Sequence, residues 1–150
     1  MKPQFLASAC LAGLSCRFDG SARPHPVIVR LYKSGRVFPV CPESLSGLPV
    51  PRKPCEQYNG RIISADGSDV TEAFHRGAEL AFARAMASGC RKAILKANSP
   101  SCGVGRIYDG SFTGTLVAGN GIFAARLLAA GFEICDESGI SELLAADAER

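Results

Sequence analysis

The sequence has no long apolar run, so no segment of its 150 residues is predicted to cross a membrane. It also lacks a run of lysines and arginines and an aromatic platform, and its net charge is only +3. We therefore expect no nucleic-acid partner, because phosphate binding needs clustered positive charge. Internal repeats, linkers and low-complexity segments are absent as well, which favours one domain covering residues 1–150.

Paired cysteines are missing too, although the chain contains seven cysteines. No two of them have the Cys-x-x-Cys spacing, which excludes a zinc ribbon and a ferredoxin-type run. Their number is odd and their density is below that of a disulfide scaffold, so we expect reduced thiols in a reducing compartment. Only about four apolar residues precede Cys10, whereas an export signal needs an apolar core of roughly 7–15. The sequence thus predicts a cytoplasmic protein.

What is present is an alternation of strand-like and helix-like segments. Strands are predicted by apolar runs at residues 5–9, 37–40, 61–65, 92–97 and 132–135. Helices are predicted by apolar spacing, caps and terminal glycines at residues 24–33, 69–88, 120–130 and 140–148. The alternation favours an α/β fold, with a single three-layer, Rossmann-like domain and a mainly parallel sheet.

Three cysteines, Cys10, Cys41 and Cys102, stand just past three different strand-like runs. In a parallel sheet the carboxyl ends of the strands lie along one edge, where ligands bind. Three thiols at that edge would form a soft metal site with one open position, which suits catalysis better than structure. The alternative is that each of the three is a small buried hydrophobic residue, as free cysteine often is.

The remaining cysteines are interpreted differently. Cys90 precedes its strand and Cys135 lies inside one, so we expect both to pack as buried side chains. Cys55 is expected in a loop. Cys16 is either a fourth ligand or a reactive thiol beside Arg17, whose charge would favour the thiolate.

Two acids and a serine are candidate catalytic residues because they neighbour the candidate ligands. Glu43 follows Cys41 by two residues, and Asp19 lies in the glycine-rich turn after Cys10. Metal-assisted hydrolysis needs a base that directs water, and both acids are expected near the metal. Ser101 adjoins Cys102 and could donate a hydrogen bond to substrate. The proline-rich residues 42–54 are expected to wrap the surface near Cys41, since prolines exclude a helix interior or a central strand.

A competing signal is the G-x-G-x-x-A pattern at residues 119–124, followed by a helix, a strand and two acids. The pattern is typical of dinucleotide-binding proteins, in which amides at the helix start face the pyrophosphate. The strand before it is short and contains Gly114, and no second nucleotide-binding half follows. We therefore interpret the glycines as a means of packing the helix closely on the sheet.

Seven ordered segments together resemble the thiouracil desulfidases, a family long catalogued as a bacterial domain of unknown function. The segments are residues 8–13 (SACLAG), 16–20 (CRFDG), 39–43 (PVCPE), 47–52 (GLPVPR), 67–71 (GSDVT), 93–103 (AILKANSPSCG) and 107–112 (IYDGSF). The resemblance implies a 4Fe–4S cluster that is held by three cysteines and leaves one iron open. That iron would take sulfur from a thiocarbonyl substrate in a non-redox hydrolysis assisted by an Asp and a Glu.

Carried over by motif, the resemblance implies that Cys10, Cys41 and Cys102 are the cluster ligands and that Glu43 is the catalytic Glu. Asp19 is the first choice for the Asp. Asp69 and Asp109 also lie in matching motifs, and Cys16 also matches a family cysteine, so these are the alternatives.

The function expected from residues and resemblance together is desulfuration of a small thiolated nucleobase or thioamide such as thiouracil, with Ser101 and Arg17 holding the ring. Two other classes stay open on the residues alone. One is a nucleotide-binding enzyme that uses residues 119–124. The other is a thiol-based sulfur carrier, or a zinc protein, that uses the same cysteines without iron.

Overall fold

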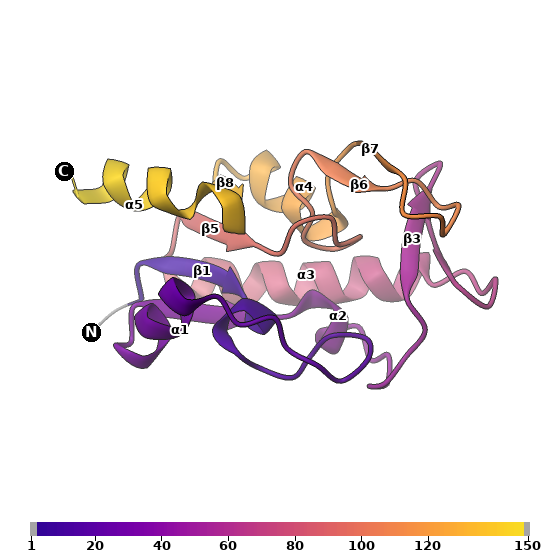
Figure 1. Cartoon of the computed structure of the whole chain (residues 1–150), viewed down its shortest axis with the longest axis horizontal. Helices are drawn as coiled ribbons and strands as arrows, with labels where there is room; N and C mark the ends of the chain where they lie inside the picture. The colour runs from indigo at the N-terminus through magenta and orange to yellow at the C-terminus, as the bar shows by residue number, and fades with distance from the viewer. Residues whose placement is uncertain (1–2, 149–150) are drawn as a thin grey trace.

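Four short parallel strands form the central sheet of the computed structural model, which describes residues 3–148 (Figure 1). They are β1 (Phe5–Ser8), β2 (Val37–Val40), β5 (Lys92–Leu95) and β8 (Glu133–Asp136), in the order β2-β1-β5-β8. Phe5 is paired with Val37, and Ile94 with Cys135. The predicted α/β fold with a parallel sheet is confirmed, and each strand lies within two residues of its expected position.

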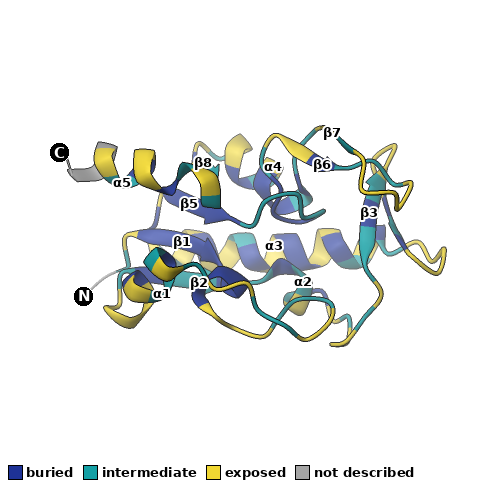
Figure 2. Cartoon of the chain, viewed as in Figure 1, coloured by how far each residue is buried: buried dark blue, intermediate teal, exposed yellow. Residues whose placement is uncertain are grey.

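Helices cover both faces of this sheet. They are α1 (Pro26–Lys33) and α5 (Ile140–Ala148) on one face, and α3 (Thr71–Ser88) and α4 (Ile122–Ala129) on the other. The side chains of β1 alternate between the layers, because Phe5 and Ala7 join the α1 and α5 core whereas Leu6 joins the α3 and α4 core. Both faces of β1 and β5 are therefore buried (Figure 2), as apolar runs without polar alternation predict.

The helices begin and end where local chemistry requires it. α1 starts with Pro26, and proline is tolerated there because an N–H at the first helical position has no intrahelical acceptor. The His25 ring accepts a hydrogen bond from the Val27 amide at 3.3 Å. α3 ends at Gly89, which adopts the left-handed conformation. Among the described residues, none of the helices is both long enough and apolar enough to span a membrane.

Two antiparallel hairpins were not predicted as such. One consists of β3 (Cys55–Tyr58) and β4 (Arg61–Ser64), and the other of β6 (Arg106–Tyr108) and β7 (Leu116–Ala118). Cys55 thus lies in a strand, and its expected loop position is wrong. The turn at Asn59 and Gly60, both with positive φ, closes the first hairpin.

The hairpins lie beyond the arrowheads of β1 and β5 (Figure 1). Two side chains of β3 form hydrogen bonds with backbone groups of the neighbouring loops. A Glu56 carboxylate oxygen accepts bonds from the amides of Gly110 and Phe112, at 3.0 and 3.1 Å. The Gln57 side-chain amide donates to the carbonyls of Pro100 and Asn120, both at 3.0 Å. The hairpins therefore cover the carboxyl end of the sheet without belonging to it.

The proline-rich segment starts with a short helix, α2 (Pro42–Leu45), because proline is tolerated in a first helical turn. α3 packs on α2 at Gly77, where an added Cβ would lie 2.1 Å from the Pro42 carbonyl oxygen. Glycine at this position permits the contact that places α2, and with it Glu43, at the end of β2.

Replacing this glycine should destabilise the fold even though alanine is the better helix former. We expect Gly77→Ala to lower the free energy of unfolding by about 1–3 kcal/mol, the usual cost of overpacking. The exposed Ala83 of the same helix is the matched control, since Ala83→Gly should cost only about 0.5–1 kcal/mol through helix propensity. Denaturant unfolding measures both, and a stabilised Gly77→Ala variant would contradict the packing argument.

Candidate functional site

A cavity of about 350 Å³ opens at the carboxyl ends of β1, β2 and β5. Its lining comes from the strand ends, from the turn after β1, from the proline-rich segment and from the hairpins. The chemically active side chains in this lining are Cys10, Cys16, Arg17, Cys41, Glu43, Arg52, Cys55, Glu56, Lys96, Ser99, Cys102 and Tyr108. This edge of the sheet is the predicted position for a ligand.

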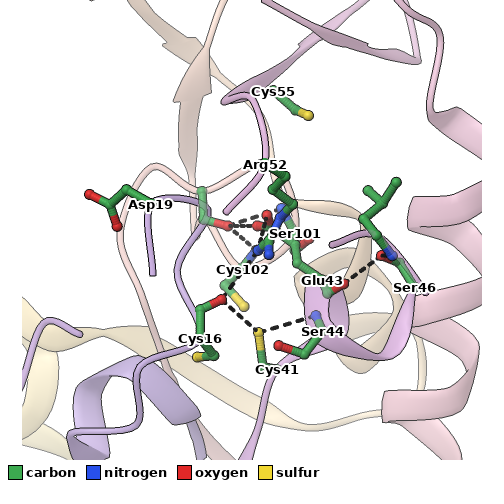
Figure 3. A network of polar contacts seen from close by, with 12 residues as sticks. Cys16, Asp19, Cys41, Glu43, Ser44, Ser46, Arg52, Cys55, Ser101 and Cys102 are labelled. Carbon is green, nitrogen blue, oxygen red and sulfur yellow. Dashed lines mark hydrogen bonds and ion pairs between the residues drawn. The ribbon is translucent and has the colours of Figure 1, made fainter. Parts of the chain in front are cut away.

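The structure brings the three candidate ligand cysteines to this one cavity. Cys10 lies in the short helix η1 (Ala9–Ala12) just past β1, Cys41 caps α2 directly after β2, and Cys102 lies in the loop after β5. Cys16 lines the same cavity, and its carbonyl oxygen lies 3.9 Å from the Cys41 thiol (Figure 3). Cys90, by contrast, is buried elsewhere and donates to the Pro3 carbonyl.

The Cys16 thiol is hydrogen-bonded with both Cys10 and Cys41, and these bonds shift the pKa values of the three thiols in different directions. The bond from Cys16 lowers the pKa of Cys41 to about 6, against the opposing effect of burial. The same kind of bond lowers the pKa of Cys10. The pKa of Cys16 is correspondingly raised far above its usual range, because its proton stabilises two neighbouring thiolates. Cys10 and Cys41 are thus the thiols most readily deprotonated, which is the state that binds metal.

Cys102 differs because it is fully enclosed, and burial raises the pKa of its thiol well above the usual value. The Ser8 hydroxyl opposes this shift by hydrogen-bonding to the thiol. Ser8 lies at the end of β1, where its oxygen also accepts the Lys96 amide at 2.9 Å. The strand ends themselves therefore position the third sulfur.

The loop that carries Cys102 is held by the start of α4. The carbonyl of Pro100 accepts a bond from the Ile122 amide, and the carbonyl of Ser101 accepts bonds from the amides of Phe123 and Ala124, at 2.9–3.2 Å. An added Cβ on Gly121 would lie 2.3 Å from the carbonyl carbon and oxygen of Ser101. The glycine is needed for close approach, as predicted, but to this loop rather than to the sheet. The helix amides that would face a pyrophosphate are already bonded to the loop.

Glu43 is held in place by a nearly buried arginine. Arg52 Nη2 lies 3.0 Å from Glu43 Oε1, and the exposed fractions of the two side chains are 5% and 18%. The same Nη2 donates to the Cys16 carbonyl at 3.2 Å (Figure 3). Ser99 Oγ lies 3.5 Å from Glu43 Oε2. Removing either partner of such a pair leaves an uncompensated charge, so the pair holds the Glu43 side chain in place beside the cysteines.

The candidate aspartates do not reach the cavity. Asp19 is exposed, and its carboxylate accepts bonds from the amide and hydroxyl of Ser21, which lower its pKa. In Figure 3 it points away from Cys41 and Cys102. Asp69 and Asp109 make equivalent turns with Thr71 and Ser111. Glu43 and Glu56 are the carboxylates that line the cavity within residues 3–148.

Ser101 is also placed differently from the expectation. Its residue is buried and lies behind the cavity, where its amide donates to Ser99 Oγ at 3.1 Å. The Ser99 hydroxyl is the one that lines the cavity, and it also accepts the Cys102 amide at 3.1 Å. The role of holding the substrate, which was expected of Ser101 from the sequence, therefore fits Ser99 better.

Sequence reasoning missed three polar residues of the site, namely Arg52, Lys96 and Ser99. Lys96 lines the cavity and forms an ion pair with Glu137 at 3.0 Å. All three lie inside segments that carry the family resemblance, which was the available signal. Nothing in the sequence indicates which acid pairs with each cation. Glu43 lies in α2 and Arg52 in the loop that follows, and the path of that loop has no periodic pattern.

Five cysteines line the cavity, namely Cys10, Cys16, Cys41, Cys55 and Cys102. In the part of the chain that the structure describes, no three His, Cys, Asp or Glu side chains are arranged to hold one metal ion. A single zinc ion needs sulfur atoms about 2.3 Å from a common centre. The arrangement suits a larger group that meets each thiolate at a separate metal atom.

The fold and site together define an α/β protein with a cysteine-lined cavity at the edge of a parallel sheet. A sequence model of the 2-thiouracil desulfurase family matches residues 5–139. The uncharacterized protein YbbK of Bacillus subtilis (strain 168) is 38% identical over 149 residues, covering 93% of this chain and 99% of YbbK. The solved structure of the 4Fe–4S-dependent thiouracil desulfidase TudS is 40% identical, with a TM-score of 0.91, and the match covers 99% of this chain and 100% of that one.

The chain belongs to the 2-thiouracil desulfurase family. This finding confirms the resemblance carried by the seven sequence segments. The likeness to TudS extends over essentially the whole of both chains, so the parallel sheet and the helices that cover it have counterparts there.

A direct test concerns the G-x-G-x-x-A pattern. We expect NAD(H) and NADP(H), from micromolar to millimolar concentrations, to leave the melting temperature unchanged, because the amides at the start of α4 are occupied. A ligand that binds only the folded state must raise its stability, so thermal unfolding detects any binding. A dinucleotide-dependent dehydrogenase measured in parallel serves as positive control, and a concentration-dependent rise for this chain would contradict the prediction.

Proposed function

We propose that this protein is a desulfidase that removes sulfur from a small thiocarbonyl compound such as thiouracil, using a 4Fe–4S cluster held by Cys10, Cys41 and Cys102. Membership of the 2-thiouracil desulfurase family supports the substrate class. The description of the similar TudS structure as 4Fe–4S-dependent supports the cofactor. The observation that carries the proposal is the meeting of these three cysteines in one cavity beside an ion-paired glutamate.

The residues present fit the cluster. Three thiols come from the ends of three adjacent strands, and they do not converge on the point that a single ion would need. Cys16 and Cys55 are then the cavity thiols that are not used as ligands. Held by three cysteines, the cluster would supply a soft, open iron that prefers sulfur to oxygen.

Glu43 is the proposed general base. Its carboxylate is held in place by Arg52, so it can orient a water molecule and take one of its protons as the oxygen attacks the thiocarbonyl carbon. The Ser99 hydroxyl, 3.5 Å from Oε2, helps to fix that orientation. The reaction balances without a reductant, because water and the thiocarbonyl give a carbonyl and hydrogen sulfide.

Asp19 has no place in this scheme, because its carboxylate is exposed and bonded to Ser21. Ser101 has none either, since it does not line the cavity. The substrate is a small molecule rather than a nucleic acid, because the cavity is bordered by the hairpins and the proline-rich segment and the net charge is only +3. Phe18, Tyr108 and Pro100 offer apolar surface for a planar ring.

Anaerobic reconstitution with iron and sulfide tests the cofactor and the ligands together. The wild-type protein should become brown, bind about four irons and four acid-labile sulfides per chain, and release hydrosulfide from 2-thiouracil. Cys10→Ala, Cys41→Ala and Cys102→Ala should each lose iron and activity, whereas Cys16→Ala should keep iron. Cys135→Ala is the matched control outside the cavity. Colourless protein with one zinc, or unchanged iron in the three ligand variants, would refute the proposal.

The role of the base has its own test. Glu43→Gln keeps the shape of the side chain and removes its charge, so the iron content should stay at the wild-type level. We expect kcat to fall by about 10²- to 10⁴-fold, the usual contribution of a general base. Glu142→Gln, on the exposed side of α5, should behave like wild type. Normal turnover of Glu43→Gln would contradict the assignment, and loss of iron would show that Glu43 has a structural role instead.

A further inference from the structure

Arg17 lies in the turn between β1 and α1 and lines the cavity directly after Cys16. Its backbone is held in a tight turn, in which its amide donates to the Ser21 carbonyl at 3.1 Å and its carbonyl accepts the Gly20 amide at 2.8 Å. The guanidinium carbon lies 5.8 Å from the centre of the Phe18 ring, which lines the cavity too. The side chain is therefore positioned by its own turn.

The other charged side chains of the cavity have protein partners. Arg52 is paired with Glu43, and Lys96 is paired with Glu137. The Glu56 carboxylate accepts two backbone amides. None of these groups needs a ligand to satisfy its charge.

Arg17 is the exception. Within residues 3–148 its guanidinium makes no hydrogen bond and no ion pair. Its Nε is buried without an acceptor, as is the Nε of Arg52, but the Nη2 of Arg52 is paired with Glu43. Asp19 and the Cys10 thiol are near enough to feel its charge, but neither is hydrogen-bonded to it, and the Asp19 carboxylate is bonded to Ser21. Because Nε has almost no exposed surface, an acceptor that enters the cavity meets the Nη groups of Arg17, which have no protein partner among the described residues.

We propose that Arg17 binds the carbonyl oxygen on the ring edge of the thiolated pyrimidine, with Phe18 packing against the ring. This inference rests on the proposed function. The guanidinium presents several N–H donors in a planar fork, which matches a carbonyl oxygen in the plane of a heterocycle. The sulfur of such a substrate must face the cysteines, and Arg17 follows one of them in the chain, so the oxygen-bearing edge of the same ring lies within its range. Arg17 would then select pyrimidines that carry an oxygen as well as a sulfur.

The test compares two product-like ligands, uracil and pyrimidin-2-one, of which only uracil carries that oxygen together with the ring N–H beside it. With anaerobic, reconstituted enzyme, calorimetry should show that Arg17→Met weakens uracil binding by about 10- to 100-fold, the usual worth of a charged hydrogen bond. Pyrimidin-2-one binding, followed by competition against 2-thiouracil turnover, should change by less than about threefold. Arg17→Lys keeps the charge and should recover part of the uracil affinity. Arg23→Met is the matched control, because Arg23 lies in the same turn but is exposed and outside the cavity.

Iron content is measured for every variant, which separates binding from cluster assembly. If Arg17→Met weakens both ligands equally, or if it loses iron while Arg17→Lys keeps iron and shows no uracil preference, Arg17 serves the thiolates and the inference is overturned. Undetectable uracil binding to wild-type enzyme at millimolar concentrations overturns it as well. The proposed function fails separately, when reconstituted wild-type enzyme binds no iron or releases no hydrosulfide from 2-thiouracil.

Discussion

The site depends on the position of β1 between β2 and β5. The chain leaves β1 toward one neighbour through α1 and reaches the other neighbour only after α3, on the opposite face of the sheet. Loops at such a point diverge and leave a crevice past the strand ends. Cys10, Cys41 and Cys102 are attached to these three strands, so parallel pairing alone brings together residues that are as much as 92 positions apart.

Much of this arrangement could be predicted from the sequence because it depends on short apolar runs. Buried strands such as residues 5–8 and 92–95 have no polar alternation, which distinguishes a parallel sheet covered on both faces. The position of each cysteine relative to its strand then follows from the pleat and the shared edge. The same reasoning placed Glu43 at the site, because it follows Cys41 by only two residues.

Side-chain partners in the loops could not be predicted in this way. Asp19 looked suitable by its distance from Cys10, yet a hydroxyl two residues later turns its carboxylate outward. Ser101 adjoins Cys102, yet the start of α4 takes its carbonyl and turns the residue inward, leaving Ser99 at the cavity. Such choices depend on hydrogen bonds worth about 1 kcal/mol each, which compete locally and leave no periodic trace in the sequence.

The cavity is formed by two structurally separate parts, the main sheet and the two hairpins. Its floor belongs to the main sheet and carries the thiols, whereas its cover consists of β3, β4, β6 and β7, which share no strand pairing with that sheet. Floor and cover are joined through the side-chain bonds of Gln57 to the carbonyls of Pro100 and Asn120 and through a single backbone bridge between Asn98 and Ile107. Changes in hairpin length or composition can therefore accumulate without moving the cysteines. A protein built this way can diversify in what it admits while its chemistry stays constant, and a designer could exchange the cover as a separate module.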